Sequence, residues 1–201
     1  TRLLLAAHAP KVRTKDGVRI LDFGAGPATA SLAALDYLSG FKPKKIEICI
    51  VENQPDASKI AKELLEKYAA KLELDVTVEC LKSIPDVSST EPFDLVFAVN
   101  VLNELSGEDS EYLLSLWNLC AGAFLLLEPS HRVASQRLVR FRERILKDFS
   151  EEVRILGPCL HMDSCPVNRT ENWCHFSEAS RDGRLEDLSL RVFKDPRRWL
   201  K

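Results

Sequence analysis

The feature that most constrains the fold of this chain is residues 18–31, where a β-branched, apolar run enters a glycine turn. The run predicts a strand, Gly24 and Gly26 follow it, and Pro27 stands where a helix is expected to begin. Glycines let the backbone approach a ligand closely, and a proline at the first helical position loses no hydrogen bond. The stretch therefore predicts a strand, a tight loop and a helix. By itself it fits a nicotinamide site, a methyl-donor site or a turn without a ligand.

Length and composition suit one α/β domain. Of the 201 residues, 45% are hydrophobic, which is enough for a sizeable core. The net charge of -2 gives no overall attraction to nucleic acid or membranes, so any contact with RNA must use a local patch. The sequence shows no apolar run that spans a bilayer and no secretory leader, and we expect a protein that is not secreted and contacts no membrane.

Predicted strands and helices alternate along the chain, which implies a parallel sheet with right-handed crossovers. Strands are expected at residues 18–23, 45–51, 76–80, 93–99, 123–127, 153–156 and 188–193. Helices are expected at residues 28–38, from Asp56 through apolar positions 60, 64, 68 and 72, from residues 106–109 through Cys120, and at 134–149. Ligands of such sheets collect at the carboxyl ends of the strands.

The unusual residues of the chain fall at these carboxyl ends. Glu52 ends the second predicted strand, residues 100–104 (Asn-Val-Leu-Asn-Glu) follow the fourth, and Glu128 follows the fifth. A carboxylate at the position of Glu52 suits a ribose, because its two oxygens match a vicinal diol; a solvated loop acid is the alternative. Nicotinamide binding fits less well, because Thr29 stands where that fingerprint has Gly or Ala.

The loop Asp-Phe-Gly-Ala-Gly at residues 22–26, Glu52 and the Asn- and Glu-rich end of the fourth strand together resemble class I S-adenosylmethionine-dependent methyltransferases over residues 18–153. The resemblance implies an α/β, Rossmann-like sheet of seven mostly parallel strands, the last one antiparallel, with helices on both faces. It also implies a set of donor-binding residues at the strand ends. These are Asp22, Gly24, Ala25, Gly26, Glu52, Asn53, Leu81 and Asn100.

The methyl acceptor is less constrained by the sequence. Asn100, Asn103 and Glu104 are candidates for orienting it, or they only line the donor pocket. The chain has no Asn-Pro-Pro-Tyr-like box for an exocyclic amine and no Pro-Cys pair for cytosine at the fourth strand. Methyl transfer from a sulfonium needs mainly alignment, so a missing general base does not exclude activity, and a donor site does not prove turnover.

A second informative segment is residues 157–176, which holds three of the six cysteines. Cys159, Cys165 and Cys174, with His161 and His175 among them, favour a metal or cluster site in a reducing compartment over a disulfide framework. Three ordinary thiols are the alternative. The other cysteines lie in strand-like or helix-like runs, where a thiol acts as a small buried hydrophobe. They are Cys49, Cys80 and Cys120.

Three motifs in this segment, Pro-Cys-x-His at 158–161, Cys-Pro at 165–166 and Trp-Cys-His-Phe at 173–176, resemble the ribosomal small-subunit methyltransferase-like family. The resemblance implies that the three cysteines ligate a 4Fe–4S cluster, with zinc as the alternative, and that a fourth Cys follows downstream. No Cys follows Cys174, so the fourth ligand lies beyond this chain, or is one of the two histidines, or the site is empty. The resemblance further implies the small ribosomal subunit and its rRNA as partners.

Local basic residues give a separate reason to consider RNA. Between residues 131 and 147, six Lys or Arg residues oppose one acid, Glu143. Four of the six share a predicted helix face that suits phosphates, and a solvated helix face is the alternative. These four are Arg137, Arg140, Arg144 and Lys147. Arg142 falls near the apolar side and interrupts the two-faced pattern.

We divide the chain into the end of an N-terminal helical region (1–17) cut from a longer protein, a donor-binding core (18–156), a Cys/His loop (157–176) and a last strand with a shortened C-terminus (177–201). We expect a monomer of the bacterial cytoplasm or mitochondrial matrix that methylates the small ribosomal subunit or helps to assemble it. A non-catalytic RNA-binding assembly factor, a small-molecule methyltransferase and a nicotinamide-binding oxidoreductase are the alternatives.

Overall fold

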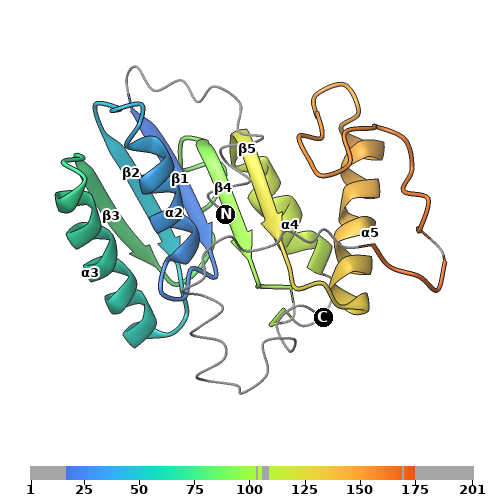
Figure 1. Cartoon of the computed structure of the whole chain (residues 1–201), viewed down its shortest axis with the longest axis horizontal. Helices are drawn as coiled ribbons and strands as arrows, with labels where there is room; N and C mark the ends of the chain where they lie inside the picture. The colour runs from blue at the N-terminus through green and yellow to red at the C-terminus, as the bar shows by residue number, and fades with distance from the viewer. Residues whose placement is uncertain (1–16, 103, 106–108, 169, 175–201) are drawn as a thin grey trace, which may run out of the picture.

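A computed structural model describes residues 17–102, 104–105, 109–168 and 170–174 of the chain, in which strands and helices alternate except between the third and fourth strands (Figure 1). The strands are β1 (Val18–Phe23), β2 (Ile46–Val51), β3 (Val76–Leu81), β4 (Phe93–Val99) and β5 (Cys120–Leu127). The helices are α2 (Thr29–Leu38), α3 (Pro55–Lys71), α4 (Asp109–Asn118) and α5 (Arg132–Asp148). No helix among these residues is long and apolar enough to cross a membrane.

The strands form a five-stranded sheet in the order β3-β2-β1-β4-β5, and every neighbouring pair is parallel. This is the order of a Rossmann-like fold, so the predicted α/β class is confirmed. The order reverses beside β1, which pairs with β2 on one side and β4 on the other. Ligands of such sheets bind in the crevice outside the carboxyl ends of the strands at this switch point.

Helices cover both faces of the sheet, because side chains along each strand alternate between two apolar clusters. Ile20 packs in the cluster that α2 and α3 cover, and Leu21 packs in the cluster that α4 and α5 cover. Figure 1 shows α2 and α3 in front of the sheet and α5 beyond β5. On α3 the buried residues are Ala61, Leu65 and Ala69. They lie one position beyond the apolar series at 60, 64, 68 and 72, and Ile60 is therefore exposed.

The predicted sixth strand is wrong. Residues 153–156 have no regular secondary structure, although Val153 is buried in the second apolar cluster. A strand exists only where a neighbouring strand supplies hydrogen bonds, and the predicted last strand at residues 188–193 lies outside the described residues. The sheet of the described residues therefore has five parallel strands instead of the seven predicted.

Two element boundaries also differ from the sequence prediction. The first helix begins at Thr29, one residue after the start of the predicted range 28–38 and two after Pro27, because Ala28 has a left-handed φ of 60° and its N–H donates to Ala25 O at 2.7 Å. Cys120 opens β5 and does not belong to the preceding helix, which ends at Asn118. The turn after β1 is thus longer than the proline suggested.

The six cysteines are all free, and they differ in burial. Cys49 is buried as predicted, Cys120 is half-buried, and Cys80 is exposed, which contradicts its predicted place in the core. Burial raises the pKa of the Cys49 thiol to about 12 and that of Cys120 to about 11. These two thiols are therefore unreactive at neutral pH.

Candidate functional site

The glycine loop after β1 contains two glycines with different surroundings. Both have positive φ, +65° at Gly24 and +50° at Gly26. A Cβ on Gly24 would lie 2.3 Å from Cγ1 of Val101, so that valine fills the space where a side chain would sit. A Cβ on Gly26 would meet no atom within 4 Å. Gly24 therefore permits close packing against the β4 corner, and Gly26 borders open space in which a ligand can approach the backbone.

The structure places Glu52 directly beside this loop. Its Oε2 accepts a hydrogen bond from the Gly26 N–H at 2.9 Å, and its Oε1 accepts from the Gln54 N–H at 2.8 Å. The Glu52 N–H donates to Leu81 O at 3.0 Å, which joins the ends of β2 and β3. The half-buried carboxylate thus lies where three strand ends meet, and Asn53 beside it is exposed.

Asp22 supports the glycine loop from the buried side. Its side chain is 1% exposed, and its Oδ2 accepts from the backbone N–H of Ser31 at 3.2 Å and from the Ser31 hydroxyl at 2.6 Å. Burial raises the pKa of this carboxyl to about 6, although the bonds from Ser31 oppose the rise. The carboxylate therefore ties the end of β1 to helix α2, and it orients the loop from inside the protein. Ala25 in the same loop is also buried.

The corner after β4 holds the predicted acceptor residues. Asn100 has a left-handed φ of 60°, its N–H donates to Leu127 O at 2.8 Å, and its side chain is exposed. Glu104 is also exposed, and Asn103 lies outside the described residues. The structure thus puts two of the three predicted candidates at the surface of this corner.

Glu128, at the end of β5, is the residue that the sequence prediction gave no role. Its Oε1 accepts from the backbone N–H groups of Val101 at 2.8 Å and Leu102 at 2.9 Å. Its Oε2 is buried and has no hydrogen-bond partner among the described residues. Burial raises the pKa of this carboxyl above its usual range. The only signal in the sequence was an acid at the end of an apolar strand, directly before Pro129.

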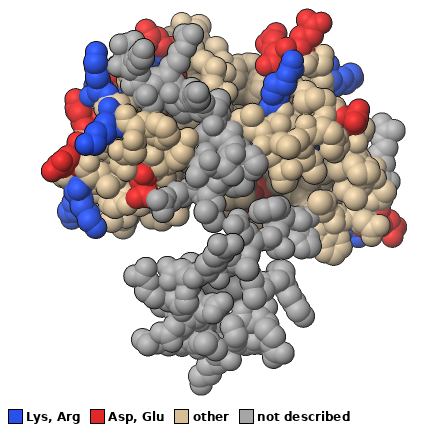
Figure 2. Space-filling model, turned by 45° about the horizontal axis from the view of Figure 1, so that its top comes forward, with Lys and Arg blue, Asp and Glu red and all other residues tan. Residues whose placement is uncertain are grey.

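The predicted basic face of α5 is divided by the structure. Arg137 donates from Nη1 to the carbonyl oxygen of Leu102, and Arg144 forms an ion pair with Glu111 at 3.4 Å. Arg140 and Lys147 are exposed. In the view of Figure 2, Lys or Arg and Asp or Glu side chains are interspersed, and neither sign forms a continuous patch. Any contact with RNA on α5 therefore depends on a few side chains.

Arg142 and Glu143, in the middle of α5, tether the cysteine segment. Arg142 donates from Nη2 to the carbonyl oxygen of His161 at 2.6 Å. Glu143 accepts from the Ser164 hydroxyl at 2.7 Å and from the Cys165 N–H at 2.8 Å. Arg142, which interrupted the two-faced pattern of the helix, therefore binds a loop that is distant in the sequence.

The predicted cluster ligands are not gathered in the structure. Cys159 and Cys174 are exposed and Cys165 is half-buried. Among the described residues, no group of three or more His, Cys, Asp or Glu side chains is arranged to hold a metal ion. His175 lies outside these residues. The three cysteines as placed do not form a cluster site.

Comparison with known protein families identifies the family of this chain. The model of a family described as mitochondrial small ribosomal subunit Rsm22 matches residues 2–191. This chain belongs to the Rsm22 family. The predicted resemblance to ribosomal small-subunit methyltransferase-like proteins is thereby confirmed. No curated protein matches this Rsm22-family chain.

Comparison with solved structures finds three to which this Rsm22-family chain is similar. It is similar to the CMeT domain of citrinin polyketide synthase (18% identity, TM-score 0.47, 61% of this chain, 31% of that chain). It is also similar to the DszA carbon methyltransferase (24% identity, TM-score 0.46, 66% of this chain, 34% of that chain). A third similar structure is an S-adenosylmethionine-dependent methyltransferase from Thiobacillus denitrificans in complex with S-adenosyl-L-homocysteine (17% identity, TM-score 0.39, 62% of this chain, 45% of that chain). The chain spans less than half the length of each of these three.

Proposed function

We propose that this chain binds S-adenosylmethionine at the ends of β1, β2 and β3 and transfers its methyl group to the small ribosomal subunit, with rRNA as the acceptor. The observation that carries the proposal is the Glu52 carboxylate, which lies 2.9 Å from the N–H of Gly26 beside open space. A loop that is open to ligand next to a carboxylate suited to a ribose is the arrangement that a nucleoside-containing donor requires. Membership of the Rsm22 family and the names of the similar structures support this choice of donor.

The residues of the donor side bind and orient. Glu52 keeps free lone pairs for the ribose hydroxyls, because each oxygen of a carboxylate accepts more than one hydrogen bond. Asp22 fixes the loop through Ser31, while Leu81 and Asn53 lie at strand ends where the adenine is expected. S-adenosylmethionine, when bound, supplies an electrophilic methyl group on a sulfonium.

On the acceptor side we assign a positioning role to Glu128. Its Oε1 is fixed by the N–H groups of Val101 and Leu102, so the geometry of the free Oε2 is set by the backbone of the corner. Glu128 therefore positions the backbone of the corner on which the candidate acceptor residues lie. Asn100, Asn103 and Glu104 then orient the acceptor from the same corner.

The family description, mitochondrial small ribosomal subunit, supports the proposed partner and compartment. We propose the mitochondrial matrix as the compartment, with rRNA contacts through the exposed Arg140 and Lys147. Arg137 and Arg144, which the sequence grouped with them, contribute to the structure through their contacts within the chain.

We further propose a 4Fe–4S cluster on Cys159, Cys165 and Cys174, with zinc as the alternative, on the sequence resemblance alone. The described residues do not fit such a group as placed, and no step of methyl transfer depends on it. The test is the iron and zinc content and the visible absorption of the full-length protein purified without oxygen. Absence of both metals would reject this assignment.

Calorimetric titration with S-adenosylmethionine tests the donor site. Glu52→Ala is expected to weaken binding by about 10- to 100-fold, because hydrogen bonds to a charged group contribute about 1.5–3 kcal/mol. Glu151→Ala removes an exposed carboxylate far along the chain and serves as the matched control. Unchanged affinity in Glu52→Ala would reject the ribose role.

A second measurement separates catalysis from assembly. If subunits assemble normally in cells that carry Glu52→Ala, while methylation of their rRNA is lost, the chain acts as an enzyme. If subunits assemble normally in these cells and no rRNA nucleotide loses a methyl group, the chain is the non-catalytic assembly factor.

A further inference from the structure

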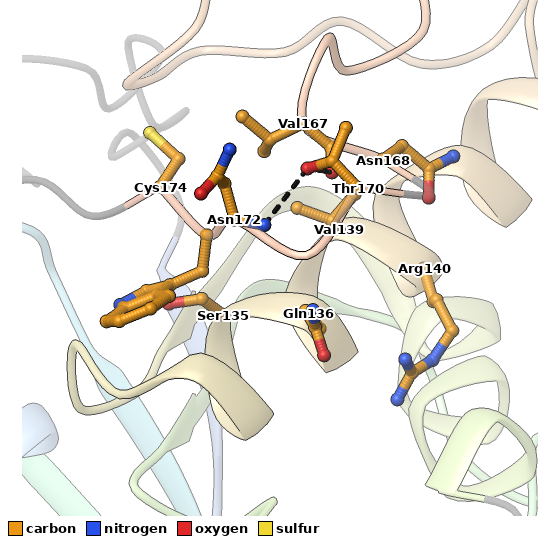
Figure 3. Close-up of a pocket in the computed structure, with 10 residues that line it drawn as sticks. Ser135, Gln136, Val139, Arg140, Val167, Asn168, Thr170, Asn172 and Cys174 are labelled. Atoms are coloured by element: carbon orange, nitrogen blue, oxygen red, sulfur yellow. Dashed lines mark hydrogen bonds between the residues drawn. The ribbon is translucent and has the colours of Figure 1, made fainter.

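A groove of about 260 Å3 lies between helix α5 and the segment 167–174, apart from the donor site. Figure 3 shows its two walls, one carrying Gln136 and Arg140 from the helix and the other carrying Asn168 and Asn172 from the segment. The helix wall is firmly placed, because Phe141 on α5 is buried in the core. The groove therefore has one rigid wall and one loop wall.

The lining of the groove has an unusual composition. Its described lining contains three carboxamides, Gln136, Asn168 and Asn172, together with the exposed guanidinium of Arg140, and no carboxylate. A carboxamide offers a donor and an acceptor side by side, which matches the edge of a nucleobase. Because these described residues include one cation and no acid, the groove favours an uncharged polar ring that is attached to a negatively charged group.

Trp173 also lines the groove. Its ring nitrogen Nε1 donates to Ser130 O at 3.1 Å, yet the residue is still 45% exposed. The hydrogen bond fixes the ring while part of its surface stays open to solvent. The turn before it is also held, because the Asn172 N–H donates to the Thr170 hydroxyl at 3.2 Å, the dashed line in Figure 3. An aromatic ring that is fixed and half-exposed suits the stacking of a base.

We propose that this groove binds one unpaired nucleobase of an RNA strand, stacked on Trp173, with the carboxamides at its edge and Arg140 at a neighbouring phosphate. The volume of about 260 Å3 lies just below the range of about 300–1,000 Å3 for sites of drug-sized ligands, and so suits a single base. The inference rests on the proposed association with ribosomal RNA, and it specifies that the RNA is single-stranded at this point.

Binding of a short RNA that contains one fluorescent 2-aminopurine tests the proposal on the full chain. Trp173→Leu is expected to weaken binding of the single strand by about 5- to 100-fold and to abolish quenching of the base analogue, because stacking is lost. Trp173→Phe retains an aromatic face and is expected to keep most of both signals. Binding of a duplex of the same sequence is expected to stay unchanged in all three proteins.

Two further variants separate the groove from general charge and from damage to the loop. Gln136→Ala changes only the helix wall and is expected to weaken the single-stranded complex without changing the melting temperature. Arg140→Ala is expected to weaken it more than Lys59→Ala, which removes an exposed cation from α3.

The outcomes distinguish this proposal from the proposed function. If Trp173→Leu and Gln136→Ala both bind the single strand as the unaltered chain does, the groove is not a base site, and the proposed function stands. If the unaltered chain binds no RNA of either form, both the groove and the direct rRNA contact are rejected. Donor binding, measured by calorimetry, is independent of both results.

Discussion

The donor side of the molecule and the segment 157–174 are held in place by different means. At the donor side, backbone groups of neighbouring strand ends bind one another, as when the Gly24 N–H donates to Val51 O at 2.9 Å. The segment is instead held by side chains: Arg142 and Glu143 of α5 bind its backbone and Ser164, and its own Trp173 donates from Nε1 to Ser130 O. One region is therefore fixed by the sheet, and the other by a tether.

This difference predicts how each region responds to substitution. Changes at the donor side disturb the sheet and the whole fold, whereas changes at the tether release a loop while the fold persists. Local opening of a region costs only the interactions that hold that region.

The largest effect is expected from Gly24→Ala. The new Cβ would lie 2.3 Å from Cγ1 of Val101, and alanine is disfavoured at a φ of +65°. We expect a loss of about 2–5 kcal/mol of stability, measured by urea unfolding. Gly26→Ala is the control, with a loss of about 1 kcal/mol, because a Cβ there has open space and only the backbone is strained. An equal loss in both variants would show that packing against Val101 is not the cause.

Glu128→Ala is expected to come next, with a loss of about 2–4 kcal/mol. It leaves the buried N–H groups of Val101 and Leu102 without their acceptor. Glu128→Gln keeps an oxygen for both N–H groups, and we expect it to unfold within about 1 kcal/mol of the unaltered chain. If Glu128→Gln is as unstable as Glu128→Ala, the charge and not the hydrogen bonds holds the corner.

Arg142→Ala should affect only the tethered segment. Loss of hydrogen bonds from a charged group is expected to raise the rate of proteolytic cleavage within residues 157–174 about tenfold or more. Global stability in urea is expected to change by less than about 1 kcal/mol, as for a loop with its own local opening. Arg140→Ala, on the same helix but outside the tether, is the control and should leave cleavage unchanged. A large loss of global stability in Arg142→Ala would show that the segment 157–174 is not held separately from the rest of the fold.

The smallest effect is expected from titration of Asp22. Its pKa of about 6 in the folded protein exceeds the ordinary 3.8, so its contribution to stability is present at low pH and is lost as pH rises through 6. Relative to Asp22→Asn, the unaltered chain should gain about 1 kcal/mol between pH 7 and pH 5. Urea midpoints of both proteins at the two pH values measure this gain. A stability difference that does not change with pH would contradict the raised pKa.

The sequence predicted the parts of the molecule that depend on local pattern. The apolar runs at β1 and β2, the glycines between them and Glu52 all follow from residue types at short spacing, and the structure brings them together. Strand alternation with helices likewise implied the parallel sheet, because each crossover must cover one face.

The failures all involve contacts between distant residues. The burial of Leu65 and the exposure of Ile60 depend on how α3 rotates against α2, and periodicity alone does not settle that rotation. Arg142 was unexplained because its partners lie about twenty residues further along the chain. The run at 153–156 has strand-like residues, but a strand also needs a neighbour.

Val101 links the two halves of the site by itself. Its side chain fills the space that Gly24 leaves, while its N–H is held by Glu128. The side chains at positions 24 and 101 therefore occupy the same space. Related chains with a larger residue at position 24 should carry a smaller one at position 101. A substitution selected for a new acceptor at Glu128 would shift this valine and so change how tightly the donor is held, which couples the evolution of the two specificities.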